Sequence, residues 1–223
     1  MKSRVIDSRR VAAALAAVTL FLLAAAPGQA GTSAEDLVHA SHEGKLRVVR
    51  NLIESGVDPD ARAGNGRTPL TEASAAGHVA IVEYLVRAGA DIDMRGYARI
   101  SPLVAAAANG HFPVLRFLVR EGAHLEMDDK YGMTALHYAA KRGDLRAVEL
   151  LLDSGAFPNP LNIGRETPLF AAASKGHYEV VAELLSRGAD TGARNGGGAT
   201  AAEAARHFGH AEVARLIDRE IDG

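Results

Sequence analysis

The chain has 223 residues, with 25 lysine and arginine residues against 27 aspartate and glutamate residues, and it contains neither cysteine nor tryptophan. The lack of cysteine excludes disulfide bonds, thiolate catalysis and cysteine ligands for a metal. The slight excess of acidic residues argues against a nucleic acid or an anionic membrane as partner, since both attract strongly basic proteins.

Residues 1–30 have the features of a cleavable export signal. Basic residues precede an apolar run over residues 11–26, and Gly28 and Ala30 place small side chains three and one positions before an expected cut after Ala30. The apolar run is shorter than the roughly 20 residues of a membrane-spanning helix, which makes an uncleaved anchor the weaker alternative. Cleavage would leave 21 basic against 26 acidic residues, a net charge of −5. We therefore expect a periplasmic or secreted protein, exported by the general or the twin-arginine route.

From residue 33 onward the sequence repeats with a period of 33 residues. Threonine or serine recurs at one phase, and glycine recurs nine residues later, as Gly44, Gly77, Gly110, Gly143, Gly176 and Gly209. A fixed period of this length is typical of stacked architectures, because one repeat cannot bury its apolar face without a neighbour. We expect one domain over residues 31–223, with repeats at about 33–62, 66–95, 99–128, 132–161, 165–194 and 198–221.

Each repeat is expected to form two short helices. In the fifth repeat, Thr167 can accept a hydrogen bond as N-cap, and Pro168 suits the first helical position. Gly176 ends this helix, and residues 180–185 then carry apolar side chains at the spacing of a second helix. The glycine-rich residues 189–199 contain an Asn-Gly pair and predict a hairpin-like connection.

The repeated motif resembles that of the ankyrin repeat family. Thr-Pro-Leu stands at residues 68–70 and 167–169, Thr-Ala-Leu-His stands at 134–137, and Gly-Ala-Asp closes two of the repeats. The resemblance covers residues 33–221 and implies an all-α solenoid of six stacked helix-pair repeats with β-hairpin-like loops along one edge. It also implies that a protein partner binds the concave face, which hairpin tips and the exposed ends of the first helices form.

Residues that keep their phase from repeat to repeat are expected to form the scaffold. We predict that the leucines of two phases are buried: Leu70, Leu103, Leu136 and Leu169, and Leu85, Leu118, Leu151 and Leu184. Four histidines also share one phase, directly after the glycine, and the ankyrin consensus has histidine there: His78, His111, His177 and His210. We interpret these histidines as structural and not as ligands.

No pattern in the sequence points to catalysis or to a bound metal. Two histidine pairs at i, i+3 could share a helix face, namely His39 with His42 and His207 with His210, but the sequence places no third ligand beside either. The motifs of serine hydrolases, zinc proteases, phosphate loops and dinucleotide sites are all missing. We therefore expect a protein that is not an enzyme, with no cofactor and no metal, and we expect a monomer.

Candidate partner-binding residues lie where the repeats differ, at positions just before each signature threonine or serine and seven to eight residues after it. Apolar, aromatic and basic side chains concentrate there in the third to fifth repeats, and such exposed groups often dominate interface energetics. The alternative is that the tips pack against one another and the lysines form a solvated face. The predicted partner-binding residues are Tyr97, Ile100, Asn109, Lys130, Tyr131, Met133, Lys141, Arg142, Ile163 and Lys175.

The sequence therefore predicts an exported ankyrin-repeat protein that binds another protein through a rigid concave face. Its basic residues suit a partner with an acidic patch. Within the envelope, such a protein could hold or inhibit an enzyme. The alternatives are a secreted effector that binds a host protein, and a carrier of a small ligand or metal.

Overall fold

The computed structural model describes residues 30–222, which fold into twelve α-helices and one short 3-10 turn. The predicted export signal falls almost entirely on residues outside this range and stays a prediction. The helices are α2 (Ala30–His42), α3 (Leu46–Glu54), α4 (Pro69–Ala76), α5 (Val79–Arg87), α6 (Pro102–Asn109), α7 (Phe112–Arg120), α8 (Ala135–Arg142), α9 (Leu145–Asp153), α10 (Pro168–Ala173), α11 (Tyr178–Ser186), α12 (Ala201–His207) and α13 (Ala211–Asp222), with the turn η1 (Tyr97–Arg99) between α5 and α6.

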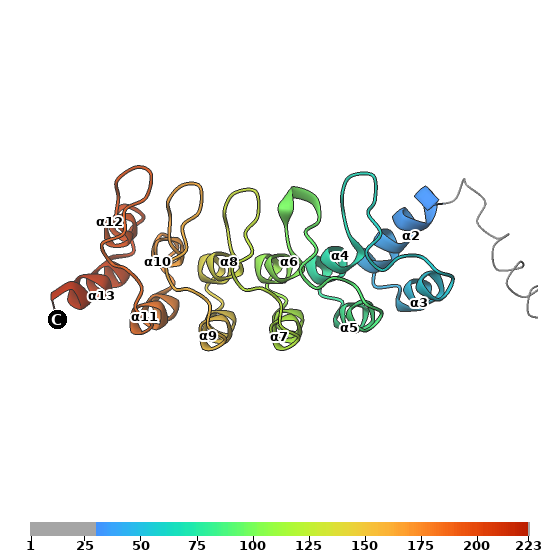
Figure 1. The fold of residues 1–223 in the computed structure, drawn as a ribbon. Helices are drawn as coiled ribbons and strands as arrows, with labels where there is room; N and C mark the ends of the chain where they lie inside the picture. The colour runs from blue at the N-terminus through green and yellow to red at the C-terminus, as the bar shows by residue number, and fades with distance from the viewer. Residues whose placement is uncertain (1–29, 223) are drawn as a thin grey trace, which may run out of the picture.

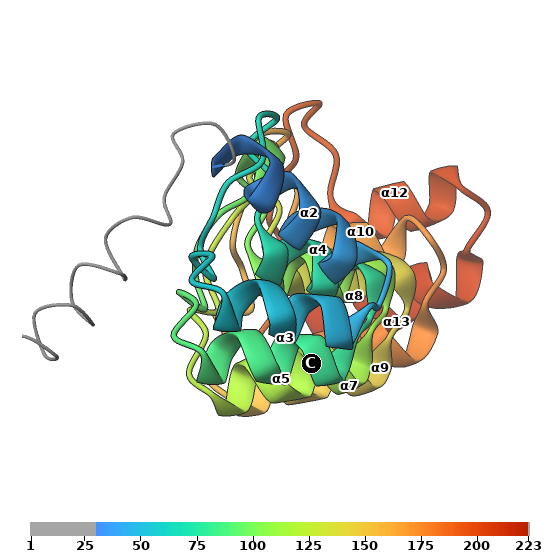
Figure 2. The ribbon, with the colours of Figure 1, turned by 90° about the vertical axis from the view of Figure 1, so that its right-hand side faces the viewer.

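The helices form the predicted stack of six pairs. The first helices of the pairs, α2 to α12 in even numbers, pack side by side in one layer, and the second helices, α3 to α13 in odd numbers, form a second layer. The connections between repeats project beyond the first helices along one edge (Figures 1 and 2). Within the described residues their β character is limited to one isolated bridge, between Asp128 and Thr134. None of the helices in residues 30–222 is long and apolar enough to cross a membrane.

The signature threonines and serine start the first helices, as predicted. In each case the side-chain oxygen accepts a hydrogen bond from the backbone N–H three residues later, and these N-caps are Thr68, Ser101, Thr134, Thr167 and Thr200. The first repeat lacks this signature, and α2 begins at Ala30, three residues before the predicted start of that repeat.

The two phases of leucine are buried, as predicted. Leu70, Leu103, Leu136 and Leu169 lie between neighbouring first helices, and all four have 2% or less of their surface exposed. The leucines of the second phase are fully buried as well, and both sets belong to one apolar cluster that runs from Leu37 in α2 to Ile217 in α13. Because this cluster continues through every interface, each repeat is stabilised by its neighbours.

The in-phase glycines and histidines form one contact that recurs between repeats. Gly77 has φ = 77° at the end of α4, and a Cβ on it would lie 2.6 Å from the ring Nδ1 of His111 in the next repeat. That ring lies over the glycine, and its Nε2 donates to the carbonyl oxygen of Ala75, 3.0 Å away. The His78 and His177 rings make the same hydrogen bond to the repeat before them, and the His210 ring lies over Gly176 in the same way. The histidines are therefore structural, as predicted.

The fourth repeat makes this contact with a different residue. Asp144 stands where the second, third, fifth and sixth repeats have histidine, and its carboxylate caps α9 by accepting from the N–H of Ala147. The guanidinium of Arg142 fills the space instead, because a Cβ on Gly110 would lie 2.4 Å from its Nη2, and its Nη1 donates to the carbonyl oxygen of Ala108 at 3.2 Å. Arg142 thus joins the third and fourth repeats.

A fully buried histidine, His137, is specific to α8. Its Nδ1 accepts from the N–H of Thr134 in a capping box, and its Nε2 donates to the carbonyl oxygen of Glu166, 3.0 Å away. The side chain is completely buried, and burial lowers its pKa below the ordinary value of 6.5. The ring is therefore neutral in the folded protein, with its proton on Nε2.

We predict that Arg142→Ala lowers the free energy of unfolding by about 1 kcal/mol, because the hydrogen bond and the contact over Gly110 are both lost. Asp144→His removes the cap of α9 in either background, but only when Arg142 is alanine can the new histidine cover Gly110. Asp144→His should therefore destabilise the Arg142→Ala protein less than it destabilises wild type, as measured by chemical denaturation of wild type, both single variants and the double variant. An equal effect of Asp144→His in the two backgrounds would contradict the assigned role of Arg142.

We also predict that His137 makes stability depend on pH. Its folded pKa lies below its unfolded pKa of about 6.5, so the unfolded chain takes up a proton first as pH falls. This contribution is complete above pH 6.5 and declines below it, by at most about 1.4 kcal/mol per pH unit. Denaturation at pH 7.5, 6.5 and 5.5 should show a smaller decline for His137→Gln, which retains a capping side chain. Equal declines for wild type and variant would exclude this role.

Candidate functional site

The concave face is built on five hairpins, which we number 2 to 6 after the repeat that each one leads into. They consist of residues 63–67, 96–100, 129–133, 162–166 and 195–199, and in each the first residue donates its backbone N–H to the carbonyl oxygen of the last, at 2.8 to 3.1 Å. The same five-residue hairpin, closed by the same hydrogen bond, is thus repeated along the edge of the stack.

Hydrogen bonds between neighbouring hairpins hold them in a row. Near the tips, the N–H of Lys130 donates to the carbonyl oxygen of Ala98 at 3.0 Å, and that of Ile163 donates to the carbonyl oxygen of Tyr131 at 2.9 Å. At the base, polar side chains accept from the backbone N–H 31 residues later, as Asp93 does from His124 at 2.9 Å. The side chains of Asp60, Glu126 and Asn159 make equivalent bonds. The face is therefore preformed, which lowers the entropy cost of binding.

Two grooves lie between the hairpins and the first helices. The C-terminal groove has a volume of about 850 Å³, and its lining comes from the fourth to sixth repeats, including Met133, Tyr138, Phe170, Ala171, Ala204 and Phe208. The N-terminal groove has a volume of about 590 Å³, and its lining comes mainly from the second and third repeats, including Thr71, Tyr97, Ile100, Val104 and Asn109. Tyr138 lines both and forms the wall between them.

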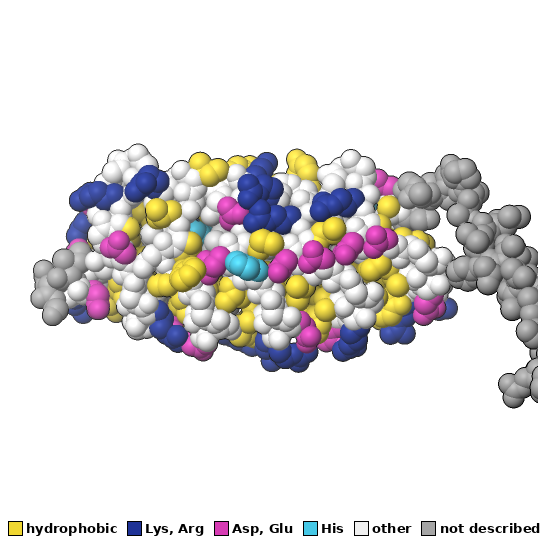
Figure 3. All heavy atoms as spheres, viewed as in Figure 1, with side chains coloured by type: hydrophobic (Ala, Val, Ile, Leu, Met, Phe, Trp, Pro, Cys, Tyr) yellow, Lys and Arg dark blue, Asp and Glu magenta, His cyan; other side chains and the backbone are white. Residues whose placement is uncertain are grey.

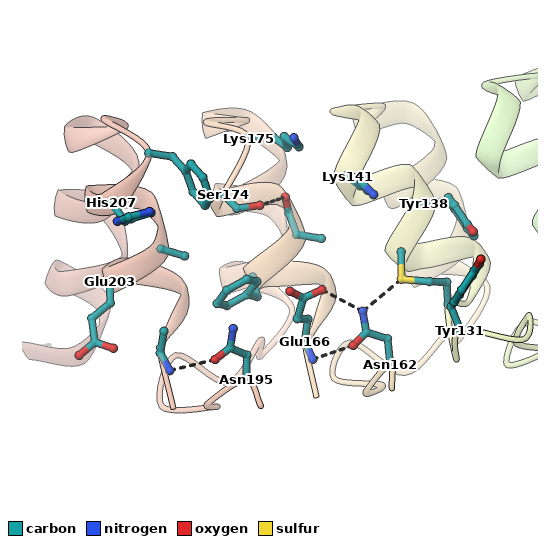
Figure 4. Close-up of a pocket in the computed structure, with 16 residues that line it drawn as sticks. Tyr131, Tyr138, Lys141, Asn162, Glu166, Ser174, Lys175, Asn195, Glu203 and His207 are labelled. Carbon is teal, nitrogen blue, oxygen red and sulfur yellow. Dashed lines mark hydrogen bonds between the residues drawn. The ribbon is translucent and has the colours of Figure 1, made fainter. Parts of the chain in front are cut away.

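The C-terminal groove is lined by two lysines and two glutamates, and none of the four pairs with another of them. Figure 4 shows Lys141 and Lys175 along one edge, with Glu166 and Glu203 toward the other. Glu166 accepts from the side-chain amide of Asn162 at 2.9 Å. Glu203 accepts from the N–H of Thr200 at 2.8 Å, and this bond holds the pKa of Glu203 below its usual value. The two lysines are exposed and form no ion pair with any residue in 30–222.

In the N-terminal groove, by contrast, the acidic and basic side chains of the lining pair with each other. Glu72 is buried there and pairs with the guanidinium of Arg67, whose Nε lies 2.7 Å from a carboxylate oxygen. The ring of His42 lies 3.1 Å from the same carboxylate group. Of the two grooves, only the C-terminal one offers an acidic partner segment basic side chains that are not already paired with a carboxylate.

A buried carboxylate fixes the wall between the grooves. Asp129, at the start of hairpin 4, accepts from the N–H groups of Tyr131 and Met133 at 2.8 and 3.0 Å. Its second oxygen accepts from the hydroxyl of Tyr138 at 2.7 Å. Burial, together with this hydrogen bond, raises the pKa of Tyr138, so the phenol stays protonated. One side chain thus sets both the hairpin turn and the position of the tyrosine ring.

The structure distributes the ten predicted partner-binding residues over three places. Four line the C-terminal groove: Tyr131, Met133, Lys141 and Lys175. Three line the N-terminal groove: Tyr97, Ile100 and Asn109. The other three line neither: Lys130, whose ammonium lies 4.8 Å from the centre of the Tyr131 ring, Ile163 at the tip of hairpin 5, and Arg142, which covers Gly110.

Five apolar side chains of the hairpins are expected to be exposed, and three of them are, whereas Ile100 is half-buried. Tyr97, Tyr131 and Ile163 are 63%, 57% and 72% exposed. The prediction of exposure is wrong for Met133, which is only 8% exposed. It is the closing residue of hairpin 4, and its sulfur lies 3.3 Å from the amide nitrogen of Asn162 in the neighbouring hairpin. Met133 therefore contributes to the inner lining of the groove.

The prediction missed Tyr138 and Phe170, which provide aromatic surface in the C-terminal groove. They stand four and three residues after the signature threonine, within the first helix, where small or polar residues occupy most other repeats. That contrast is the signal that could have revealed them. The positions expected to face a partner did not include these two, because they lie between the scaffold leucine and the exposed end of the helix.

No group of three or more histidine, aspartate or glutamate side chains in residues 30–222 is arranged to hold a metal ion. The lining of the two grooves offers apolar contact, hydrogen bonds and, in the C-terminal groove, unpaired lysines.

Comparison with protein-family models gives three matches along the chain. Residues 37–86 match a model of ankyrin repeats in many copies, residues 98–162 match a model of ankyrin repeats in three copies, and residues 165–196 match the single ankyrin repeat. A comparison with curated proteins found no match. The matched segments cover most of the stack and agree with its helix pairs and hairpins, so this chain belongs to the ankyrin repeat family.

Proposed function

We propose that this protein is exported and that its C-terminal groove holds or inhibits an enzyme of the compartment that it enters. Ankyrin repeats indicate a protein–protein interaction module, and their proteins are generally non-catalytic. The proposal of export rests on the basic, apolar and small-residue pattern of residues 1–30.

One observation favours the C-terminal groove as the binding surface, namely its combination of aromatic surface with two unpaired lysines. Phe170, Tyr138 and Phe208 provide area that a partner can bury. Lys141 and Lys175 lie beside it without ion partners in residues 30–222, so their charge is available to a partner carboxylate. The apolar contacts supply most of the affinity of such an interface. Charges of this kind add specificity and raise the rate of association.

We expect the spacing of the lysines to select partner carboxylates. Lys141 lies in the last turn of α8 and Lys175 lies two residues after the end of α10, and packed helices lie about 8 to 10 Å apart. Two acidic residues two positions apart in an extended segment point to the same face and span about 7 Å, a separation that two long lysine side chains can match. An extended segment with acids at that spacing and an apolar residue next to them on the same face would fit the groove.

A pull-down from envelope extract tests this proposal, with the purified protein as bait. We predict that Lys141→Glu combined with Lys175→Glu lowers recovery of the partner about tenfold or more, corresponding to about 1.4 kcal/mol. The matched control is Arg47→Glu with Arg116→Glu, which makes the same change of charge at exposed positions of α3 and α7 in the second layer.

Equal recovery by the groove variant and by wild type would contradict the C-terminal groove as the binding surface. Export is tested in the same cells by the mass of the chain in the envelope fraction. Loss of residues 1–30 would support export, whereas an intact chain confined to the cytoplasm would contradict it.

A further inference from the structure

Two hairpin tips place an arginine in a backbone conformation that the other tips give to glycine. Hairpins 2, 4 and 6 have Gly66, Gly132 and Gly198 at their fourth position, with φ of 81°, 74° and 82°. Hairpins of this type turn the chain and then place one residue in the left-handed region, where glycine is favoured. Arg99 and Arg165 hold the same position in hairpins 3 and 5, with φ of 64° and 57°, and hairpin 3 differs in that Ala98 is left-handed as well, with φ of 57°.

The steric surroundings explain the glycine of hairpin 4 but not the arginines. A Cβ on Gly132 would lie 3.0 Å from the backbone nitrogen of Ile163, so hairpin 5 excludes a side chain there. A Cβ on Gly66 or Gly198 would meet nothing within 4 Å. Glycine is thus the unstrained choice at this position and no neighbouring group calls for a larger residue, yet two hairpins carry arginine.

Contacts within the described residues do not offset this strain at Arg165. Its side chain is exposed, and its guanidinium forms no hydrogen bond or ion pair in residues 30–222. The guanidinium of Arg99 pairs with Asp128 at 3.2 Å, and Asp128 also pairs with Arg95 at 3.0 Å. Non-glycine residues held in the left-handed region are concentrated at functional sites.

The same tips carry the exposed apolar side chains of the hairpin row. Each of the three central tips exposes one cation and one large apolar group: Arg99 with Tyr97, Lys130 with Tyr131, and Arg165 with Ile163. Hairpins 2 and 6 have neither, because their tips read Gly64-Asn65-Gly66 and Gly196-Gly197-Gly198. Figure 3 shows apolar side chains at the tops of the central hairpins, with lysine and arginine side chains beside them.

We propose that the tips of hairpins 3 to 5 form a specificity-determining edge of the partner site, and that Arg165 is kept in the left-handed conformation to bind a carboxylate of an acidic, apolar-containing protein segment. This inference rests on the proposed function, because the segment belongs to the same partner. Arginine binds a carboxylate through two parallel hydrogen bonds, and the neighbouring Tyr97 and Ile163 can pack against apolar side chains. The hydrogen bonds between the hairpins keep the row in place before the partner arrives.

Selection of random 12-residue peptides displayed on phage against the purified protein tests this inference. We expect the selected peptides to be rich in aspartate and glutamate and to contain aromatic or aliphatic residues. Arg165→Gly should weaken their binding, measured by fluorescence polarisation, by about tenfold, while its Tm equals or exceeds that of wild type because the strain is removed. The control variant Arg116→Ala loses the same charge from the second layer, in α7, and should bind the peptides as wild type does.

The other outcomes separate this inference from the proposed function. Peptides that bind Arg165→Gly as tightly as wild type, but lose affinity for the variant with Lys141→Glu and Lys175→Glu, would overturn the role of the tips and leave the C-terminal groove as the site. Peptides that bind both variants unchanged would overturn both. Sedimentation of the wild type, but not Arg165→Gly, with phosphatidylglycerol vesicles would overturn the inference in favour of a membrane surface.

Discussion

The structure depends on the contact that each repeat makes with the next one. No helix pair can bury both of its faces, so the leucines of two phases join into one apolar cluster along the whole stack. A ring or guanidinium from one repeat also covers the glycine at the end of the preceding first helix, as His111 covers Gly77 and Arg142 covers Gly110. Glycine is therefore required at this position for two reasons: it adopts a positive φ, and its missing side chain leaves space for the group that covers it.

This stacking also gives the concave face its character. Hydrogen bonds at the tips and at the bases of the hairpins hold them in register, and Asp129 joins its hairpin to Tyr138 on the first helix. The resulting surface needs little rearrangement to bind a partner. Its chemistry differs along its length, because Arg67 balances the buried carboxylate of Glu72, whereas Lys141 and Lys175 have no ion partner in residues 30–222.

The period in the sequence is sufficient to predict the scaffold, because a residue that recurs every 33 positions meets the same neighbour in every repeat. Thr134 and Leu136 can therefore be assigned from their phase alone, the first as a cap and the second as core. The site is harder to predict, because its residues depend on contacts that occur once. Met133 is buried by Asn162 of the next hairpin, and Arg142 replaces a histidine that the fourth repeat lacks. The left-handed conformation of Arg165 is likewise a property of one turn.

The central claim is that a protein partner occupies the C-terminal groove, and amide hydrogen exchange of the complex tests it most directly. The partner recovered by pull-down is added to the purified protein, and exchange is compared with and without it. We predict new protection in hairpins 5 and 6 and at the ends of α8 and α10, which carry Lys141 and Lys175. Protection confined to the second helices α5, α7 and α9, with the groove exchanging as in the unbound protein, would contradict the claim.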